Sequence, residues 1–113
     1  MNLPQVVYDT LLPIKCIVTH MVRAKDLPSA SYRIFDRRPT LHGDGKPIRE
    51  EAYCWIDIWT INGKSKPISN EIKQHMANAG WRYVREEDGI ETEQGIYQLS
   101  LIFYLEFSNQ DGG

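Results

Sequence analysis

The sequence predicts a single α+β domain in which one mixed or antiparallel sheet of about five strands packs with two helices, in the order α-β-β-β-α-β-β. Apolar residues recur at helical spacing in two segments and alternate with polar residues in several others. The chain also has the length, 113 residues, and the apolar content, 42%, of one ordinary globular domain. We therefore expect residues 1–108 to form the domain and residues 109–113 to form a disordered tail.

The first elements are predicted to be a short helix and a strand. Asn2 can cap a helix over residues 3–12, Pro4 suits its first turn, and Pro13 ends it. The segment 14–22 is rich in β-branched residues and roughly alternates, which indicates a strand.

Two further strands, at residues 30–35 and 51–61, flank a segment of different character. Residues 36–49 contain two Pro and two Gly and show no apolar period, which favours a long loop or a long hairpin connection. Loops of such length are commonly functional or disordered. The strand 51–61 alternates clearly and has two distinct faces. One face carries Cys54, Ile56 and Ile58, and the other carries Tyr53, Trp55, Asp57 and Trp59.

The C-terminal half predicts a helix followed by two strands. Ser65 can cap the helix, Pro67 fits its first turn and Gly80 closes it, while the apolar residues between them repeat at helical spacing. Residues 81–85 alternate as a strand, and the acidic run after them is expected to turn the chain. Residues 96–107 then return as a long strand.

The aromatic face of the strand 51–61 needs cover. A sheet protected on one side only would leave Tyr53, Trp55 and Trp59 in water. Either helices lie on both sides of the sheet or a partner covers this face, and both interpretations stay open. Because Trp and Tyr are enriched at the centres of protein interfaces, a contact between subunits is one candidate role.

No arrangement of residues predicts catalysis, a metal site or a cofactor. His20, His42 and His75 are isolated from one another, and no pair of His or Cys residues has metal-ligand spacing. The sequence contains no glycine-rich phosphate-binding motif. Asp57 lies between apolar residues of a strand, so its carboxylate must be either solvated or paired with a strand neighbour. We expect no enzymatic activity, and we interpret the two cysteines as buried, reduced thiols.

The overall charge and the apolar stretches exclude two general classes of partner. The formal net charge of −2 gives no general attraction to nucleic acid or to an anionic membrane. The apolar stretches are far shorter than the ~20 residues that span a bilayer. The start of the chain does not have the pattern of a secretory signal. We expect a protein that is made and kept in the cytosol.

Two segments nevertheless carry opposite local charge. Residues 33–49 hold five basic and two acidic residues, and residues 86–93 hold five carboxylates and no base. They are either two solvated loops or the two sides of a head-to-tail contact between copies, which closes into a ring when the rotation permits. On the second interpretation the candidate interface residues are Arg37, Arg38, His42, Lys46, Arg49, Glu86, Glu87, Asp88, Glu91, Glu93, Trp55 and Trp59.

The residues from 51 onwards follow a recognisable pattern. It contains a strand with Ile56-Asp57-Ile58-Trp59, a helix that ends at Gly80-Trp81, an acidic turn with Tyr97, and a strand with Phe103-Tyr104-Leu105-Glu106. This pattern resembles the tail-completion proteins of long-tailed bacteriophages, the tail terminator or tail-to-head joining family. The N-terminal helix and the Pro-rich segment after it agree in order, so the resemblance covers nearly the whole chain.

The resemblance implies a structural virion protein without enzymatic activity. Such a protein forms a ring, usually a hexamer, at the head-proximal end of the tail tube, ends tube growth and joins the tail to the head. Its partners would be further copies of itself, the tail tube protein and a head connector or stopper protein, in a tail assembled in the cytoplasm of the bacterial host. The isolated chain could be a monomer.

The alternative function is a small nucleic-acid-binding accessory domain. It would use the basic segment 33–49, with Tyr32 or Trp55 for stacking against bases. A steep dependence of DNA binding on salt concentration would support this alternative.

Overall fold

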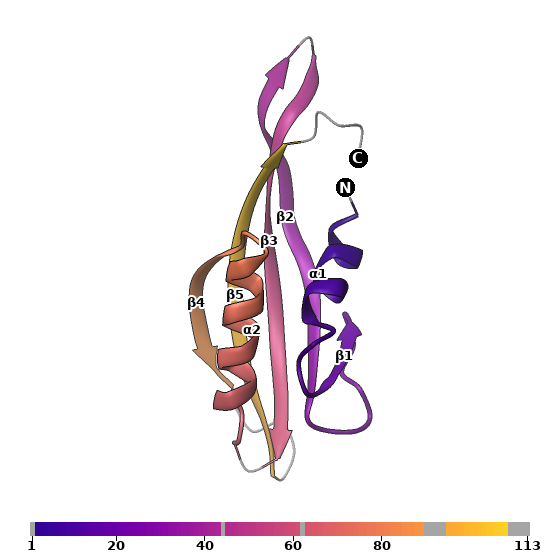
Figure 1. Cartoon of the computed structure of the whole chain (residues 1–113), viewed down its shortest axis with the longest axis vertical. Helices are drawn as coiled ribbons and strands as arrows, with labels where there is room; N and C mark the ends of the chain where they lie inside the picture. Colours follow the sequence, from indigo (N-terminus) through magenta and orange to yellow (C-terminus); the bar gives the residue numbers. More distant parts are fainter. Residues whose placement is uncertain (1, 44, 62, 90–94, 109–113) are drawn as a thin grey trace.

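The computed structural model describes residues 2–43, 45–61, 63–89 and 95–108, and it confirms the predicted α+β class and element order. The elements are α1 (Leu3–Leu11), β1 (Ile17–His20), β2 (Ser29–Gly43), β3 (Lys46–Ile61), α2 (Lys66–Asn78), β4 (Arg82–Asp88) and β5 (Ile96–Ser108) (Figure 1).

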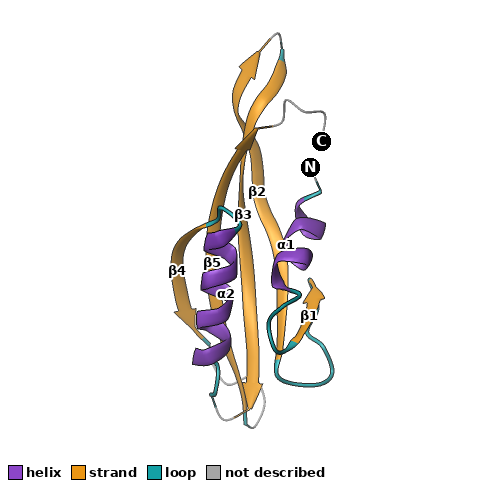
Figure 2. Ribbon diagram, viewed as in Figure 1, coloured by secondary structure: helices purple, strands orange, loops and turns teal. Residues whose placement is uncertain are grey.

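The five strands form one mixed sheet in the order β1-β2-β3-β5-β4. β1 runs parallel to β2, and every other neighbouring pair is antiparallel. Both helices lie on the same side of this sheet, with α1 beside β1 and β2 and α2 beside β4 and β5 (Figure 2). The interpretation in which helices cover both faces of the sheet is therefore wrong.

The core lies between this helical layer and the sheet. Alternate residues of β3, including Cys54, Ile56 and Ile58, are fully buried on the helix side, as the sequence pattern predicts. The helices contribute their buried stripes to the same cluster. The fully buried helix residues are Leu3, Val7, Leu11, Ile72 and Met76.

The prediction of a long loop at residues 36–49 is wrong, and the hairpin alternative is the better description. β2 continues to Gly43 and β3 begins at Lys46, so most of this segment is paired strand. Register shifts interrupt the pairing after Phe35 and again around Leu41. These bulges break the two-residue period, which is why the sequence shows no alternation there.

The long hairpin makes the molecule elongated, with extents of 54 × 24 × 22 Å. β5 ends where Ser108 pairs with Arg49, and beyond that point β2 and β3 continue as a two-stranded arm. Figure 1 shows this arm projecting from one end of the body. We call the tip of β2 and β3, from the pair Leu41 and Arg49 outward, the hairpin arm.

Two other predicted boundaries also change. The residues 86–88 do not turn the chain, because they belong to β4 and pair with β5. The first strand covers only Ile17–His20 and not 14–22. It ends before Met21, whose φ of 71° is incompatible with extended strand geometry.

Candidate functional site

The side of the sheet opposite the helices carries the aromatic residues that drew attention in the sequence. We call it the open face. Its residues are Ser29, Ser31, Arg33 and Phe35 from β2, Tyr53, Trp55, Asp57 and Trp59 from β3, and Gln98, Ser100, Ile102 and Tyr104 from β5. Neither α1 nor α2 lies on this side (Figure 2).

Three residues of the open face are nevertheless buried. Ser31 and Ser100 are each 5% exposed, and Ile102 is 1% exposed. Because the helices are on the other side, the large side chains of the open face itself must cover them. The indole nitrogen of Trp59 donates a hydrogen bond to Ser31 Oγ at 3.2 Å, which holds that ring down on the sheet. The face is therefore sealed in part by its own tryptophans.

Asp57 is the polar centre of this face. Its Oδ1 accepts hydrogen bonds from Trp55 Nε1 at 2.7 Å, Gln98 Nε2 at 2.9 Å and Ser100 Oγ at 2.6 Å. The register explains the contact, because Ser100 lies directly opposite Asp57 on β5. Of the two predicted states of this carboxylate, pairing with strand neighbours is the observed one. Hydrogen bonds to a charged acceptor are strong, so the cluster fixes the Trp55 ring on the sheet.

Arginine side chains form a further layer above the rings. The guanidinium of Arg33 lies 5.0 Å from the centre of the Trp55 ring, and that of Arg23 lies 5.5 Å from the Trp59 ring. Arg82 stands in the same relation to Tyr104, at 4.8 Å. These distances suit cation–π attraction. The open face thus combines aromatic rings with guanidinium groups and leaves little bare apolar surface.

The arginines of the predicted basic segment have partners in their own chain. Arg37 Nε lies 3.1 Å from Glu50, Arg38 Nε 2.6 Å from Glu51, and Arg49 Nε 2.7 Å from Glu106. Two of these carboxylates directly follow residue 49 in the sequence. The segment 33–49 is consequently less basic in three dimensions than its composition indicates.

Glu51 also accepts a hydrogen bond from the hydroxyl of Tyr104, at 2.8 Å. The hydrogen bond from Arg38, followed by that from Tyr104, lowers the pKa of Glu51. The same carboxylate raises the pKa of Tyr104 to about 12. These groups keep fixed protonation states near neutral pH and are poorly suited to proton transfer.

The acidic residues of β4 are also paired within the chain. Glu86 lies 2.9 Å from Lys73 Nζ, and Glu87 lies 3.2 Å from Arg85. Glu91 and Glu93 lie outside the described residues. The side chains of His42 and Lys46 are likewise outside the description, although their backbones belong to β2 and β3. The structure does not bring the basic and acidic segments together in one chain, since the arm and β4 are apart in Figure 1.

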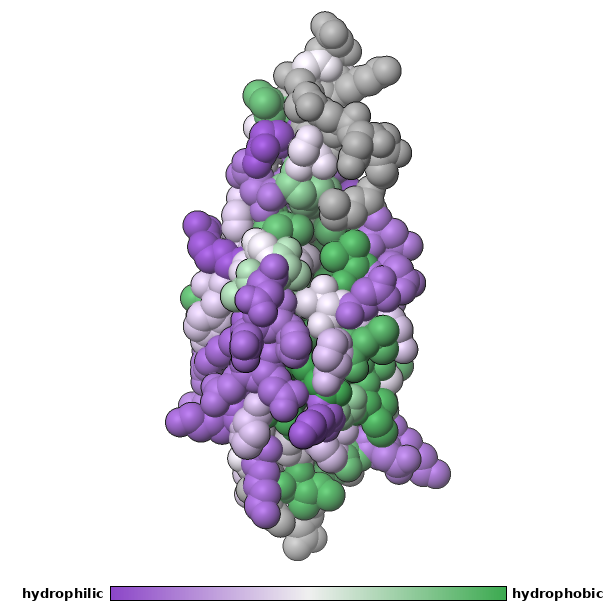
Figure 3. All heavy atoms as spheres, viewed as in Figure 1, coloured by the Kyte–Doolittle hydropathy of each residue, from purple (hydrophilic) through white to green (hydrophobic). Residues whose placement is uncertain are grey.

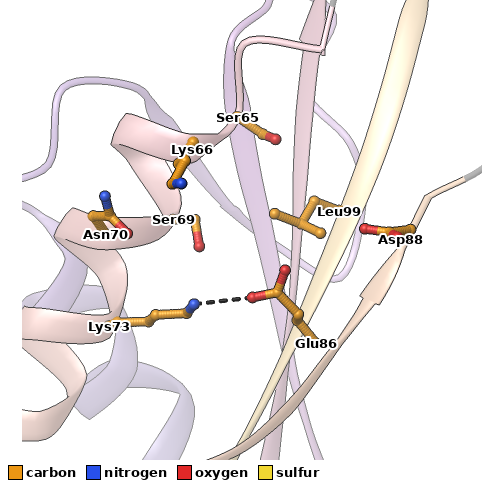
Figure 4. A pocket seen from close by; sticks show the side chains of 8 residues that line it. All are labelled: Ser65, Lys66, Ser69, Asn70, Lys73, Glu86, Asp88 and Leu99. Atoms are coloured by element: carbon orange, nitrogen blue, oxygen red, sulfur yellow. Dashed lines mark hydrogen bonds and ion pairs between the residues drawn. The ribbon is translucent and has the colours of Figure 1, made fainter.

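One surface hollow of about 260 Å³ gathers ionisable groups between α2 and β4 (Figure 4). Lys66, Ser69 and Lys73 line it from α2, and Glu86 and Asp88 line it from β4. The hydrogen bond between the amine and the carboxylate lowers the pKa of Glu86 and raises that of Lys73. Both groups are stabilised in the charged state, whereas a general acid or base needs a pKa near the working pH.

The chemistry-bearing residues elsewhere are separate from one another. Among the described residues no group of three or more His, Cys, Asp or Glu could hold a metal ion. Burial raises the pKa of Cys54 and raises that of Cys16 to about 11, with the charge of Glu71 adding to the effect at Cys16. Both thiols are therefore protonated near neutral pH. Within the described part of the chain, no helix is long and apolar enough to cross a membrane.

Sequence reasoning missed several members of the open face. Arg23, Gln98 and Ser100 contact Trp59 or Asp57 only because the chain brings β5 and the segment before β2 next to β3. The alternation of β5 places Gln98 and Ser100 on the face opposite its large apolar residues, which was the available signal. Arg23 follows β1 in an irregular segment and has no such signal.

No family model and no curated protein matches this sequence.

Proposed function

We propose that this chain is a structural assembly protein that forms a ring at the head-proximal end of a bacteriophage tail tube, ends tube growth and joins the tail to the head. The resemblance of residues 51–105 to the tail-completion family motivates the proposal. Under it, the chain acts in the virion tail after assembly in the cytoplasm of the bacterial host, and it acts without enzymatic chemistry.

The observation that carries the proposal is the hairpin arm. It extends from one end of an elongated body, and its base is held by the ion pairs Arg37–Glu50 and Arg38–Glu51 and by pairing to β5. Leu41 on the arm is half exposed. A protrusion at one end of a subunit suits contact with a neighbour stacked along an axis, such as the last ring of a tube or a head connector.

Completion of the tail would then depend on shape. A ring whose one end fits the tube and whose other end differs from a tube subunit offers no place for another tube subunit to add. Growth stops when such a ring has docked. The open face, which is covered by its own rings and arginines, can tolerate water during the time before assembly.

One observation favours the nucleic-acid alternative. Arg33 stacks on Trp55 and has no carboxylate partner among the described residues. Against it, Arg37, Arg38 and Arg49 are paired with carboxylates, which reduces the charge available for phosphate contacts.

The test is electron microscopy of phage particles assembled in a host strain whose copy of the gene is deleted. We expect abnormally long tubes or tails without heads, and restoration of normal particles by the wild-type gene. A matched pair of complementing variants then tests the arm. Leu41→Asp changes the arm, and Tyr97→Asp changes a similarly exposed residue at the start of β5, which is the end of that strand far from the arm. We expect only Leu41→Asp to fail. Normal, headed tails in the deletion strain would refute the proposal, and DNA binding that weakens steeply with salt would favour the alternative.

A further inference from the structure

The two edges of the sheet differ in character. β1 forms one edge and β4 forms the other, since the strand order is β1-β2-β3-β5-β4. An edge strand presents unpaired backbone groups to which another chain can add. Natural edge strands usually carry charges that prevent this addition, and β4 does so with Arg82, Arg85 and three consecutive carboxylates.

The β1 edge has no such protection. The stretch 16–22 contains no Lys, Arg, Asp, Glu or Pro. Met21 is 68% exposed, Val22 is 67% exposed, and Ile17 is also exposed. Figure 3 shows hydrophobic residues gathered over β1 and the adjacent end of α1, whereas the outer side of α2 is hydrophilic. An apolar edge of this kind is typical of a strand-addition site.

The backbone of β1 is oriented for addition. Ile17 N donates to Pro28 O and Met21 N donates to Tyr32 O, so these amides point into the sheet. Because successive amides of a strand point to opposite sides, those of Val18 and His20 point outward. They are available to a strand laid along the outer edge of β1.

From this geometry we infer that β4 of a second copy of this chain occupies the β1 edge, so that the sheet continues from one subunit to the next. The inference rests on the proposed function, which requires a contact between two different surfaces of identical subunits. A rotation about an axis along the strands brings β4 of one copy beside β1 of the next. Since β1 and β4 run in opposite directions within the sheet, the new pair is antiparallel.

The side chains of the two edges match in this orientation. In the antiparallel register that keeps the helices of both copies on one side of the sheet, Thr19 lies beside Arg85 on the open face, and the exposed Met21 lies beside Tyr83, which is 40% exposed. Apolar residues therefore meet apolar residues across the new pair.

The charges are also complementary. Lys15 lies close to the acidic end of β4 in this orientation, and of the three carboxylates there Asp88 has no ion-pair partner among the described residues. The partner of the acidic strand is accordingly the β1 flank of a neighbour, in place of the basic segment 33–49 that composition favours. The arm remains available for contacts along the ring axis.

Cysteine cross-linking tests the pairing directly. Met21→Cys and Tyr83→Cys are combined in a Cys16→Ser background, and the chain is oxidised both in purified form and in tails assembled with this variant as the sole copy. Within one chain the two positions lie at opposite edges of the sheet, about 19 Å apart, too far for a disulfide. We expect a ladder of dimers, trimers and larger species. The matched control, Leu41→Cys with Tyr83→Cys, should give several-fold less product.

The outcomes separate this inference from the proposed function. Tails of normal length whose subunits give no ladder, or a ladder equally strong in the control, would overturn the edge pairing and leave the proposed function in place. A ladder from the purified chain, together with normal tails in the deletion strain, would support the pairing and overturn the proposed function. No ladder in either preparation overturns the pairing.

A charge exchange gives a second readout. Asp88→Lys should lower the yield of the ladder several-fold, and Lys15→Glu in the same chain should restore it. Arg38→Glu in place of Lys15→Glu should not restore it. Restoration by Arg38→Glu alone would assign the acidic strand to the basic segment and refute the β1 pairing.

Discussion

Removal of the Asp57 carboxylate tests whether the open face is held together from within. In Asp57→Ala, the donors Trp55 Nε1, Gln98 Nε2 and Ser100 Oγ all lose their acceptor. Ser100 is almost fully buried, whereas Trp55 and Gln98 are partly exposed and can recover water. A hydrogen bond to a charged group contributes about 1.5–3 kcal/mol, and with this partial recovery we expect a loss of about 2–4 kcal/mol in the free energy of unfolding.

The isosteric variant Asp57→Asn separates geometry from charge. These three hydrogen bonds all end on Oδ1, so an asparagine that keeps its oxygen there retains the acceptor and loses only the charge. We expect a loss of about 1 kcal/mol. Its amide group would occupy the place of Oδ2, for which the described residues supply no hydrogen-bond donor.

The assay is urea unfolding followed by tryptophan fluorescence and by far-ultraviolet circular dichroism. Agreement of the two signals shows that the whole domain is reported and not only Trp55. Glu87→Ala serves as the control, because this residue is exposed on the same face. A loss below about 0.5 kcal/mol for Asp57→Ala, or equal losses for the Ala and Asn variants, would contradict the role of the carboxylate.

Three other predictions follow from burial and charge. The pKa of Glu51 is lowered from its usual value of 4.5, so the ionised carboxylate stabilises the fold above pH 4.5. The free energy of unfolding should therefore fall as the pH drops below 4.5, and this fall should be smaller in Glu51→Gln. Equal pH profiles for the two proteins would refute this prediction. Native protein at pH 8 should react slowly with a thiol reagent at both Cys16 and Cys54, and urea should expose both; rapid labelling of Cys54 without denaturant would contradict its burial. Phe103→Ala should cost about 3–5 kcal/mol and lower Tm strongly, because this fully buried ring fills the centre of the core; a loss under about 1 kcal/mol in thermal unfolding would show that the core repacks.

The periodic parts of the fold were predictable from local sequence. The stripe of α2, with its proline at the start and Gly80 after its end, and the alternation of β3 each depend on residues close in the chain. The structure confirms these elements within a few residues. The local pattern of apolar residues is sufficient to predict these two elements, because one face of each is buried and the other is not.

The hairpin arm was harder to predict because its stability depends on pairing across the hairpin. Bulges remove the alternation of residues 36–43, and the stabilising ion pairs join Arg37 and Arg38 to carboxylates 13 residues further along the chain. A charge count that stops at residue 49 omits Glu50 and Glu51. The excess of positive charge in residues 33–49 therefore depended on the choice of residue 49 as the end of the segment.

The open face illustrates a limit of a different kind. The alternation of the strand predicted Trp55, Asp57 and Trp59 on one side and indicated that these side chains need cover. The answer depends on the sheet register, which places Ser31 and Ser100 on either side of Asp57 and so provides small residues over which the rings can lie. Register follows from long-range pairing, which single-strand patterns do not contain.

The distribution of exposed apolar residues explains why we assign subunit contacts to the edges of the sheet and not to its aromatic face. An aromatic residue that is hydrogen-bonded to its own sheet and covered by an arginine, as Trp55 is by Arg33, gains little by leaving water, because a partner would first have to displace the guanidinium. Met21 and Val22 have no such cover and are the more exposed. Burial of these two side chains yields a favourable apolar term without breaking an existing contact, which is why we propose the β1 edge as the surface of association.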